Sequence, residues 1–151
     1  MTSSPYPARR LPDPEYLGEL YQDVPSKRLF AWFVDVLFIA VIVGVLTLFS
    51  FLTALFFLPF LFAVVSFLYR WGTLASRSAT PGMRLMSIEL RDAQGDYLSG
   101  STAFLHTLGY FISVAVFPFQ LVSIAMMLVT RRKQGLSDMV LGTVALNKQV
   151  A

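Results

Sequence analysis

The longest apolar run in the chain is the feature that most constrains its fold. From Leu29 to Tyr69, 41 consecutive residues carry one formal charge, which belongs to Asp35. A second run, from Thr102 to Thr130, holds 29 residues with no Asp, Glu, Lys or Arg. About 20 apolar residues are enough to cross a bilayer as a helix. The two runs therefore predict an integral membrane protein, and the first run has room for two crossings.

Composition argues against several other classes of protein. The chain has no cysteine and one histidine, so neither a thiolate site nor a histidine-rich metal site is expected. No phosphate-binding loop or catalytic triad is recognisable, so we expect no enzyme activity, no catalytic residues, no metal and no cofactor. The sequence pI is about 9.4, but the positive charge flanks the apolar runs. That pattern orients a membrane protein, so the bilayer and not nucleic acid is the predicted partner.

The distribution of basic residues predicts the topology. The twelve Lys and Arg residues form three groups of four, which lie before, between and after the apolar runs. The turn Ser50-Phe51-Leu52-Thr53 inside the first run carries no charge. Short basic flanks stay in the cytoplasm. We therefore expect spans at about residues 29–50 and 53–71, with the amino terminus and the loop of residues 72–101 in the cytoplasm.

The second apolar run has an ambiguous length. Its 29 residues are too few for two full crossings, which need about 40 residues. They are also more than the roughly 20 residues that a single crossing needs. Pro118 lies near its middle and interrupts the helical hydrogen bonds there. We favour two short, tilted or re-entrant helices, at about residues 102–117 and 119–130, that fold back at Phe117-Pro118-Phe119. The carboxyl terminus is then cytoplasmic, and a three-span topology stays open as the alternative.

The polar segments predict a small cytoplasmic β element. Residues 86–91 alternate apolar and polar side chains as a half-buried strand does, residues 92–96 have turn chemistry, and Tyr97-Leu98 begins a return strand. Ser137 is expected to cap a short helix that ends at Gly142, before a strand near residues 143–147. A sheet joining residues 85–98 to 143–147 follows.

The predicted fold class is an all-α multi-pass membrane protein. It contains a helical hairpin, a second pair of short or re-entrant helices and the small cytoplasmic β element. Residues 1–26 hold five of the eight prolines and are predicted to form a cytoplasmic tail with little regular structure. Residues 27–148 form the single membrane domain.

Three stretches of sequence resemble a known family. They are VPSKRLFAWFVD at residues 24–35, TPGMRL at residues 80–85 and QGLSDMVLGT at residues 134–143. Their order and spacing resemble the RDD family of small bacterial membrane proteins, named for one arginine and two aspartates. The resemblance covers about residues 24–148, and it identifies those three residues as Arg28, Asp35 and Asp138. Where the family often has an arginine, this chain has His106.

The resemblance implies a location and one activity. It places the chain in the bacterial inner (plasma) membrane, and ion transport has been proposed for some members of the family. Most members have no assigned activity, so the resemblance alone implies little chemistry.

Spacing suggests how the charged residues pair. Arg28 and Asp35 are seven residues apart, so they share a helix face but lie about 10 Å apart along its axis. Asp138 follows the second run at the depth of Arg28, and we predict that these two residues form an ion pair. Asp35 has two interpretations: a carboxylate that exchanges protons or cations, or a structural carboxylate bound by a neighbouring Arg, Ser or backbone group.

Two further groups of polar residues are candidates. His106, Tyr110 and Ser113 form a stripe at helical spacing, which either faces Asp35 along a polar pathway or makes a helix contact. Arg84 is expected to bind a lipid phosphate or an acidic group of a partner, or else to be solvated.

Two functional hypotheses remain, and the sequence leads us to favour the first. The first is a transport component, as a homo-oligomer, in which Asp35 with Arg28 and Asp138 handles protons or monovalent cations. The second is a non-transporting scaffold, assembly factor or accessory subunit of a larger membrane complex, in which the same three residues only hold the fold. A phenylalanine-rich second helix suits the second hypothesis because it offers a broad apolar surface for docking.

Overall fold

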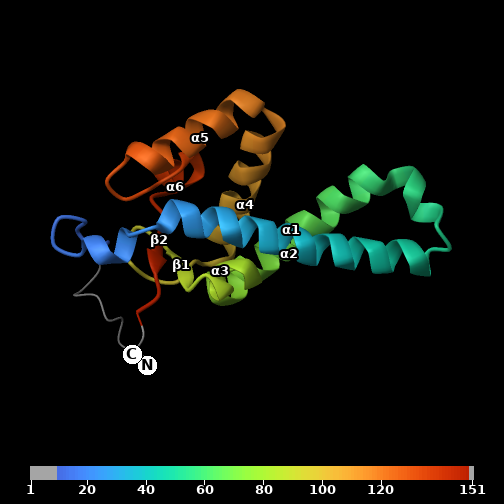
Figure 1. The fold of residues 1–151 in the computed structure, drawn as a ribbon, viewed down its shortest axis with the longest axis horizontal. Coiled ribbons are helices and arrows are strands. Elements are labelled where there is room, and N and C mark those ends of the chain that lie inside the picture. The colour runs from blue at the N-terminus through green and yellow to red at the C-terminus, as the bar shows by residue number, and fades with distance from the viewer. Residues whose placement is uncertain (1–9, 150–151) are drawn as a thin grey trace.

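The computed structural model describes residues 10–149 as a mostly helical fold (Figure 1). The elements in chain order are η1 (Gly18–Tyr21), α1 (Val24–Phe49), η2 (Thr53–Phe57), α2 (Leu58–Arg77), α3 (Pro81–Leu85), β1 (Ile88–Arg91), α4 (Gly100–Ala115), α5 (Phe117–Val129), α6 (Leu136–Leu141) and β2 (Val144–Asn147). The expected helical hairpin, second helix pair and small β element are all present.

The helices α1 and α2 form the hairpin, which extends to one side of the molecule (Figure 1). The buried residues of α1 recur every fourth position, at Ala31, Asp35, Ile39 and Val43, and form one inner face. The remaining faces are apolar and exposed. Both helices begin or end outside the predicted spans, because α1 starts at Val24 and α2 continues to Arg77. By length and composition each helix could cross a membrane.

The helices α4 and α5 form an arch above α1 (Figure 1). Their axes are bent by 117° at Val116, and Pro118 stands in the first turn of α5. Helices of 16 and 13 residues are about 24 and 20 Å long, shorter than the roughly 30 Å hydrocarbon core. The predicted fold-back is present, and its break lies one residue before the predicted Phe117. Counted as one bent span, the pair would bring the number of candidate spans to three.

The strands β1 and β2 pair antiparallel, with Ile88 opposite Asn147 and Arg91 opposite Val144. The predicted sheet between the middle loop and the carboxyl-terminal segment is thus correct. Tyr97-Leu98 is not a return strand, because the backbone N–H of Leu98 is bound by Ser78 Oγ at 2.6 Å instead.

The alternating pattern of β1 predicted a strand buried on one face, but all four of its residues are buried. One face of the sheet, with Ile88 and Leu90, packs against the hydrophobic cluster of α1, α2 and α3. On the other face, Leu20 and Tyr21 of η1 pack against Val144 and Leu146. The second face of the sheet is thus covered by the segment before α1. The local sequence of that segment did not predict this contact.

The segment before α1 has little regular structure in its described part, as predicted, but it is tied to the sheet. The hydroxyl of Tyr21 donates to the carbonyl of Pro12 at 2.7 Å. Asn147 Nδ2 donates to the carbonyls of Glu19 and Gln22, both at 2.9 Å. Residues 1–9 of the predicted tail lie outside the described residues.

Candidate functional site

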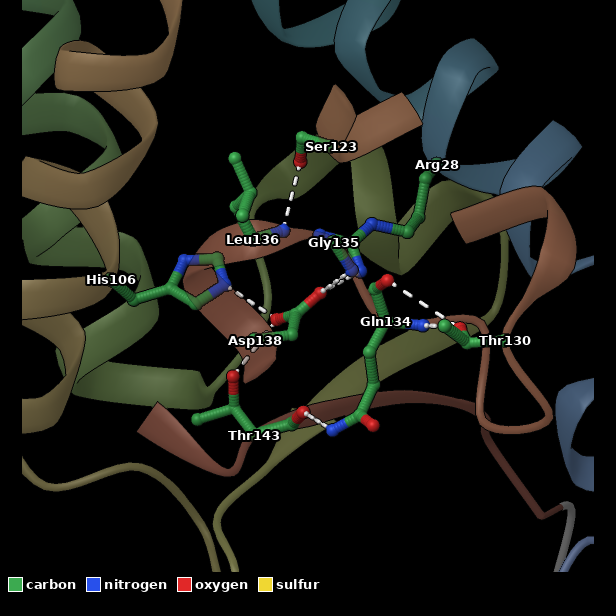
Figure 2. A network of polar contacts seen from close by, with 9 residues as sticks. All are labelled: Arg28, His106, Ser123, Thr130, Gln134, Gly135, Leu136, Asp138 and Thr143. Carbon is green, nitrogen blue, oxygen red and sulfur yellow. Dashed lines mark hydrogen bonds and ion pairs between the residues drawn. The ribbon is translucent and has the colours of Figure 1, made fainter. Parts of the chain in front are cut away.

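The carboxylate of Asp138 is the centre of a buried polar cluster (Figure 2). Arg28 of α1 donates to Oδ2 at 2.5 Å, and His106 Nε2 of α4 lies 2.9 Å from Oδ1. The hydroxyl of Thr143 donates to Oδ1 at 2.8 Å, and the backbone N–H of Gly135 donates to Oδ2 at 3.1 Å. The predicted Arg28–Asp138 pair is present, and one fully buried carboxylate joins α1, α4, α6 and the start of β2.

Short-range chemistry explains why α6 holds Asp138 there. Gly135, and not the predicted Ser137, is the residue before the first turn, and its N–H binds the Asp138 side chain three residues later. A Cβ on Gly135 would lie 2.6 Å from Ser123 Oγ and 2.7 Å from Met127 Cε of α5. A side chain at this position would therefore displace Ser123 or Met127. Gly142 ends the helix as predicted, at a φ of 71°.

The environment of Asp138 favours its charged form. Complete burial by itself raises the pKa of a carboxyl group, because it removes solvation of the charge. The guanidinium of Arg28 and the hydrogen bond from His106 act in the opposite direction and outweigh burial. The pKa of Asp138 is therefore held well below its ordinary value, and the side chain is an anion at neutral pH.

Asp35 lies in a second, separate cluster. Its Oδ1 accepts from the Tyr69 hydroxyl at 2.9 Å and from the backbone N–H of Gly82 at 2.8 Å. Its Oδ2 accepts from the Thr80 hydroxyl at 2.5 Å. The side chain is buried, and none of the ion pairs among the described residues includes it. Asp35 thus ties α1 to α2 and to the first turn of α3 through neutral donors.

The motif Thr80-Pro81-Gly82 is built to receive Asp35. Thr80 caps α3, since its hydroxyl accepts from the N–H of Met83, and Pro81 stands in the first turn. A Cβ on Gly82 would lie 2.2 Å from the carbonyl oxygen of Ala31. The motif therefore begins a short helix that presses against α1.

The polar stripe of α4 does not act as one unit. His106 binds Asp138 and not Asp35, and Ser113 donates to the carbonyl of Gly109 in its own helix at 2.6 Å. The hydroxyl of Tyr110 accepts from Trp32 Nε1 at 2.7 Å, and the guanidinium of Arg70 lies 4.4 Å from the centre of the Tyr110 ring. The stripe therefore makes helix contacts, with α6 through His106 and with α1 and α2 through Tyr110.

The two clusters share one cavity of about 560 Å³ between α1 and the arch of α4 and α5. Its lining includes Asp35, Asp138, His106 and Tyr110, together with Ser113 and many apolar side chains. The stripe and Asp35 thus border the same space without contact between His106 and Asp35. This cavity is the candidate site.

Arg84, the remaining sequence candidate, is exposed on α3 and does not line the cavity. Among the described residues, no group of three or more His, Cys, Asp and Glu side chains is placed to hold a metal ion.

Several residues of the site were not predicted. Tyr69 and Arg70 stand where the first apolar run ends, and polar residues at such a boundary are a usable signal. Thr143 and Gln134 were quoted only as parts of a motif, yet Thr143 binds Asp138 and Gln134 Nε2 binds the Thr143 carbonyl at 2.7 Å (Figure 2). Their roles depend on the packing of α6 and were not visible in local sequence.

Comparison with known proteins agrees with the resemblance. The RDD family model matches residues 24–142, which is most of the chain and includes all three of Arg28, Asp35 and Asp138. No curated protein and no solved structure matches the chain. On the extent of the family match, with helices that could span a membrane, this chain belongs to the RDD family.

Proposed function

We propose that the chain is a multi-pass protein of the bacterial inner membrane with both ends and the middle loop on the cytoplasmic side. Two observations support this topology. The sheet joins the middle loop to the carboxyl-terminal segment, and η1 packs on the same sheet, so these three segments lie at one end of the hairpin. The basic residues of the chain flank the apolar runs at that end, as the positive-inside rule requires.

Cysteine labelling tests the topology, since the chain has no native cysteine. Single cysteines replace the exposed residues Thr53, Gln94 and Gln149, and intact cells are treated with an impermeant maleimide. The expected result is labelling at Thr53 alone, with all three labelled after the membrane is permeabilised. Labelling at Gln149 in intact cells would require three crossings and contradict the proposed topology.

Within that topology, we propose a non-transporting role as an accessory or assembly subunit of a larger membrane complex. The observation that carries this proposal is that the oxygen atoms of both motif carboxylates accept hydrogen bonds from other parts of the fold. Asp138 has four bonded donors and Asp35 has three. A carboxylate that carries cations must exchange its partners for the ion, and each lost bond to a buried charge costs about 1.5–3 kcal/mol.

Transport of protons or monovalent cations is the second candidate. The observation that favours it is the shared cavity, whose lining includes Asp35, His106 and Asp138. Acids within membrane segments often mark ion pathways. Under this hypothesis Asp35 is the exchanging group, because it has no cationic partner among the described ion pairs.

Ion flux and assembly distinguish the two candidates. Purified protein in proteoliposomes is tested for proton and sodium flux, and gently extracted membranes are analysed for a complex larger than the monomer. The accessory role predicts no flux above protein-free vesicles and a complex that survives extraction. Flux by the wild type that Asp35→Asn abolishes would favour transport instead.

A matched variant separates chemistry from folding in this test. Thr80→Val removes a donor from the same cluster but leaves the Asp35 carboxylate in place. Flux lost in Asp35→Asn but kept in Thr80→Val would indicate a transporting carboxylate. Equal loss of assembly in both variants would indicate that the Asp35 cluster maintains the shape of the surface to which the partner protein binds.

A further inference from the structure

The cavity carries a feature that neither candidate function uses: an arginine without a carboxylate partner among the described residues. Its lining contains two arginines, Arg28 and Arg70, and the histidine His106. Arg28 is neutralised by Asp138 at 2.5 Å. Arg70 and His106 each have a buried ring or guanidinium nitrogen with no hydrogen-bond partner among the described residues.

Arg70 is the cation of this cavity that is left without a carboxylate. It belongs to none of the ion pairs among the described residues, and its Nε is buried without an acceptor. The face of the Tyr110 ring, 4.4 Å from the guanidinium carbon, stabilises the charge but accepts no N–H in the guanidinium plane. Burying a charge without a bonded partner is costly. A bound anion would supply the missing acceptor.

His106 lies on the same wall but is already engaged. Its side chain is 9% exposed, and its Nε2 lies 2.9 Å from Asp138 Oδ1. The neutral tautomer that donates from Nε2 leaves a lone pair and not an N–H on Nδ1, so the contact with an anion falls to Arg70. His106 and Tyr110 are four residues apart on α4, so they lie one helical turn apart on the same face.

Neither acid of the cavity is paired with Arg70 among the described residues. Asp138 is paired with Arg28, and Asp35 is held by three neutral donors that belong to α2 and α3. The charged group of the lining that is left available to a ligand is the half-buried guanidinium of Arg70.

The rest of the cavity is apolar. Leu29, Trp32, Ile124, Met127 and Leu128 contribute to its lining. A volume of about 560 Å³ is far more than a phosphate ion fills and lies within the usual range for sites of small organic ligands. Arg70 stands at the first charged position after the apolar part of α2, which is the depth at which lipid headgroups lie.

We propose that this cavity binds an anionic amphiphile, with a phosphate headgroup on the Arg70 guanidinium and the acyl chain along the apolar wall of α1 and α5. Basic pockets between membrane helices on the cytoplasmic side are suited to anionic headgroups. The arginine guanidinium supplies planar N–H donors that match phosphate oxygens.

Native mass spectrometry of the full chain in detergent tests the proposal. Phosphatidylglycerol, phosphatidylcholine and inorganic phosphate are added separately, and the bound fraction is measured at each concentration. We expect phosphatidylglycerol to be retained at least about tenfold more tightly than phosphatidylcholine, because one charge-assisted contact contributes about that factor. Equal retention of the two lipids would overturn the proposal.

Variants show whether the cavity is responsible. Arg70→Gln should lower phosphatidylglycerol affinity about tenfold. The matched control is Arg77→Gln, seven residues further along α2, exposed and outside the cavity lining, which should leave affinity unchanged. Ser113→Leu fills the cavity without changing its charge and should also reduce binding. It keeps the test decisive if Arg70→Gln does not fold.

Two results would overturn the proposal. An equal effect of Arg70→Gln and Arg77→Gln would mean that the lipid binds by surface charge alone. Binding of inorganic phosphate that depends on Arg70, without preference for phosphatidylglycerol, would assign the site to a free anion and reject the amphiphile.

Discussion

The two ends of the hairpin are packed in opposite ways. At one end, which we call the base, α3, α6, η1 and the sheet surround the start of α1. There Val24, Ala31 and Ile88 are all but fully buried. At the other end, the tip of residues 48–60, no large apolar side chain is buried, and Phe51 and Phe56 are 93% and 85% exposed.

The difference in packing shows which part of the chain stabilises the fold. The base contains every buried charged residue of the described chain. Asp35 and Asp138 are bound by partners distant in sequence, and Glu89 and Arg91 bind each other two residues apart on β1. The tip has only backbone and Ser50 hydrogen bonds within its own turn. The side chains of the base are buried by other segments of the same chain. Those of the tip can be covered only by lipid or by another protein. Perturbation should therefore be severe at the base and small at the tip.

The largest effect is expected at Asp138. Asp138→Asn leaves the half-buried Arg28 without its anion, and breaking such a pair costs about 3–5 kcal/mol of unfolding free energy. Chemical unfolding in detergent measures the loss. The control Asp96→Asn, on an exposed loop, should stay within about 0.5 kcal/mol. The double variant with Arg28→Gln should lose less than the sum of the single variants, and strict additivity would mean that the two residues do not interact.

A smaller loss is expected where α3 presses on α1. Gly82→Ala forces a Cβ to 2.2 Å from the Ala31 carbonyl oxygen, and crowding of this kind costs about 1–3 kcal/mol. Gly44→Ala is the matched control, because a Cβ there meets nothing within 4 Å and alanine favours the helix by up to about 1 kcal/mol. Thermal unfolding should move down for the first variant and up or not at all for the second. The reverse order would show that α3 is not held against α1.

The pH dependence sharpens the role of Asp138. A carboxyl whose pKa is lower in the folded state contributes stability that is complete above its unfolded pKa, about 3.9, and is lost as pH falls through the folded value. The difference in unfolding free energy between the wild type and Asp138→Asn should therefore stay constant from pH 7 to about pH 5. Chemical unfolding in detergent at each pH measures it. A difference that shrinks between pH 7 and 5 would contradict the lowered pKa.

The smallest effect is expected at the tip. Phe56→Ala removes a side chain that is 85% exposed, and substitutions at such positions usually change unfolding free energy by no more than about 0.5 kcal/mol. Unfolding in detergent should not distinguish this variant from the wild type. A loss as large as that of Gly82→Ala would mean that the tip is packed by another part of a larger assembly even in detergent.

Sequence alone was sufficient for the elements whose signals are local or periodic. The hairpin, the break near Pro118 and the β pairing between residues 88–91 and 144–147 all follow from apolar run length, proline chemistry and alternation. The Arg28–Asp138 pair was also predictable, because a charge at the edge of the membrane needs a partner at its own depth.

Tertiary structure alone decided the remainder. The partners of Asp35 come from α2 and α3, as many as 47 residues away, and nothing local shows that Tyr69, Thr80 and Gly82 meet at this carboxylate. Of the two interpretations of the α4 stripe, the one in which His106 faces Asp35 is not observed, since His106 binds Asp138. Sequence determines which groups must be buried and satisfied. The choice of partner depends on which helices meet, and that is set by packing over the whole chain.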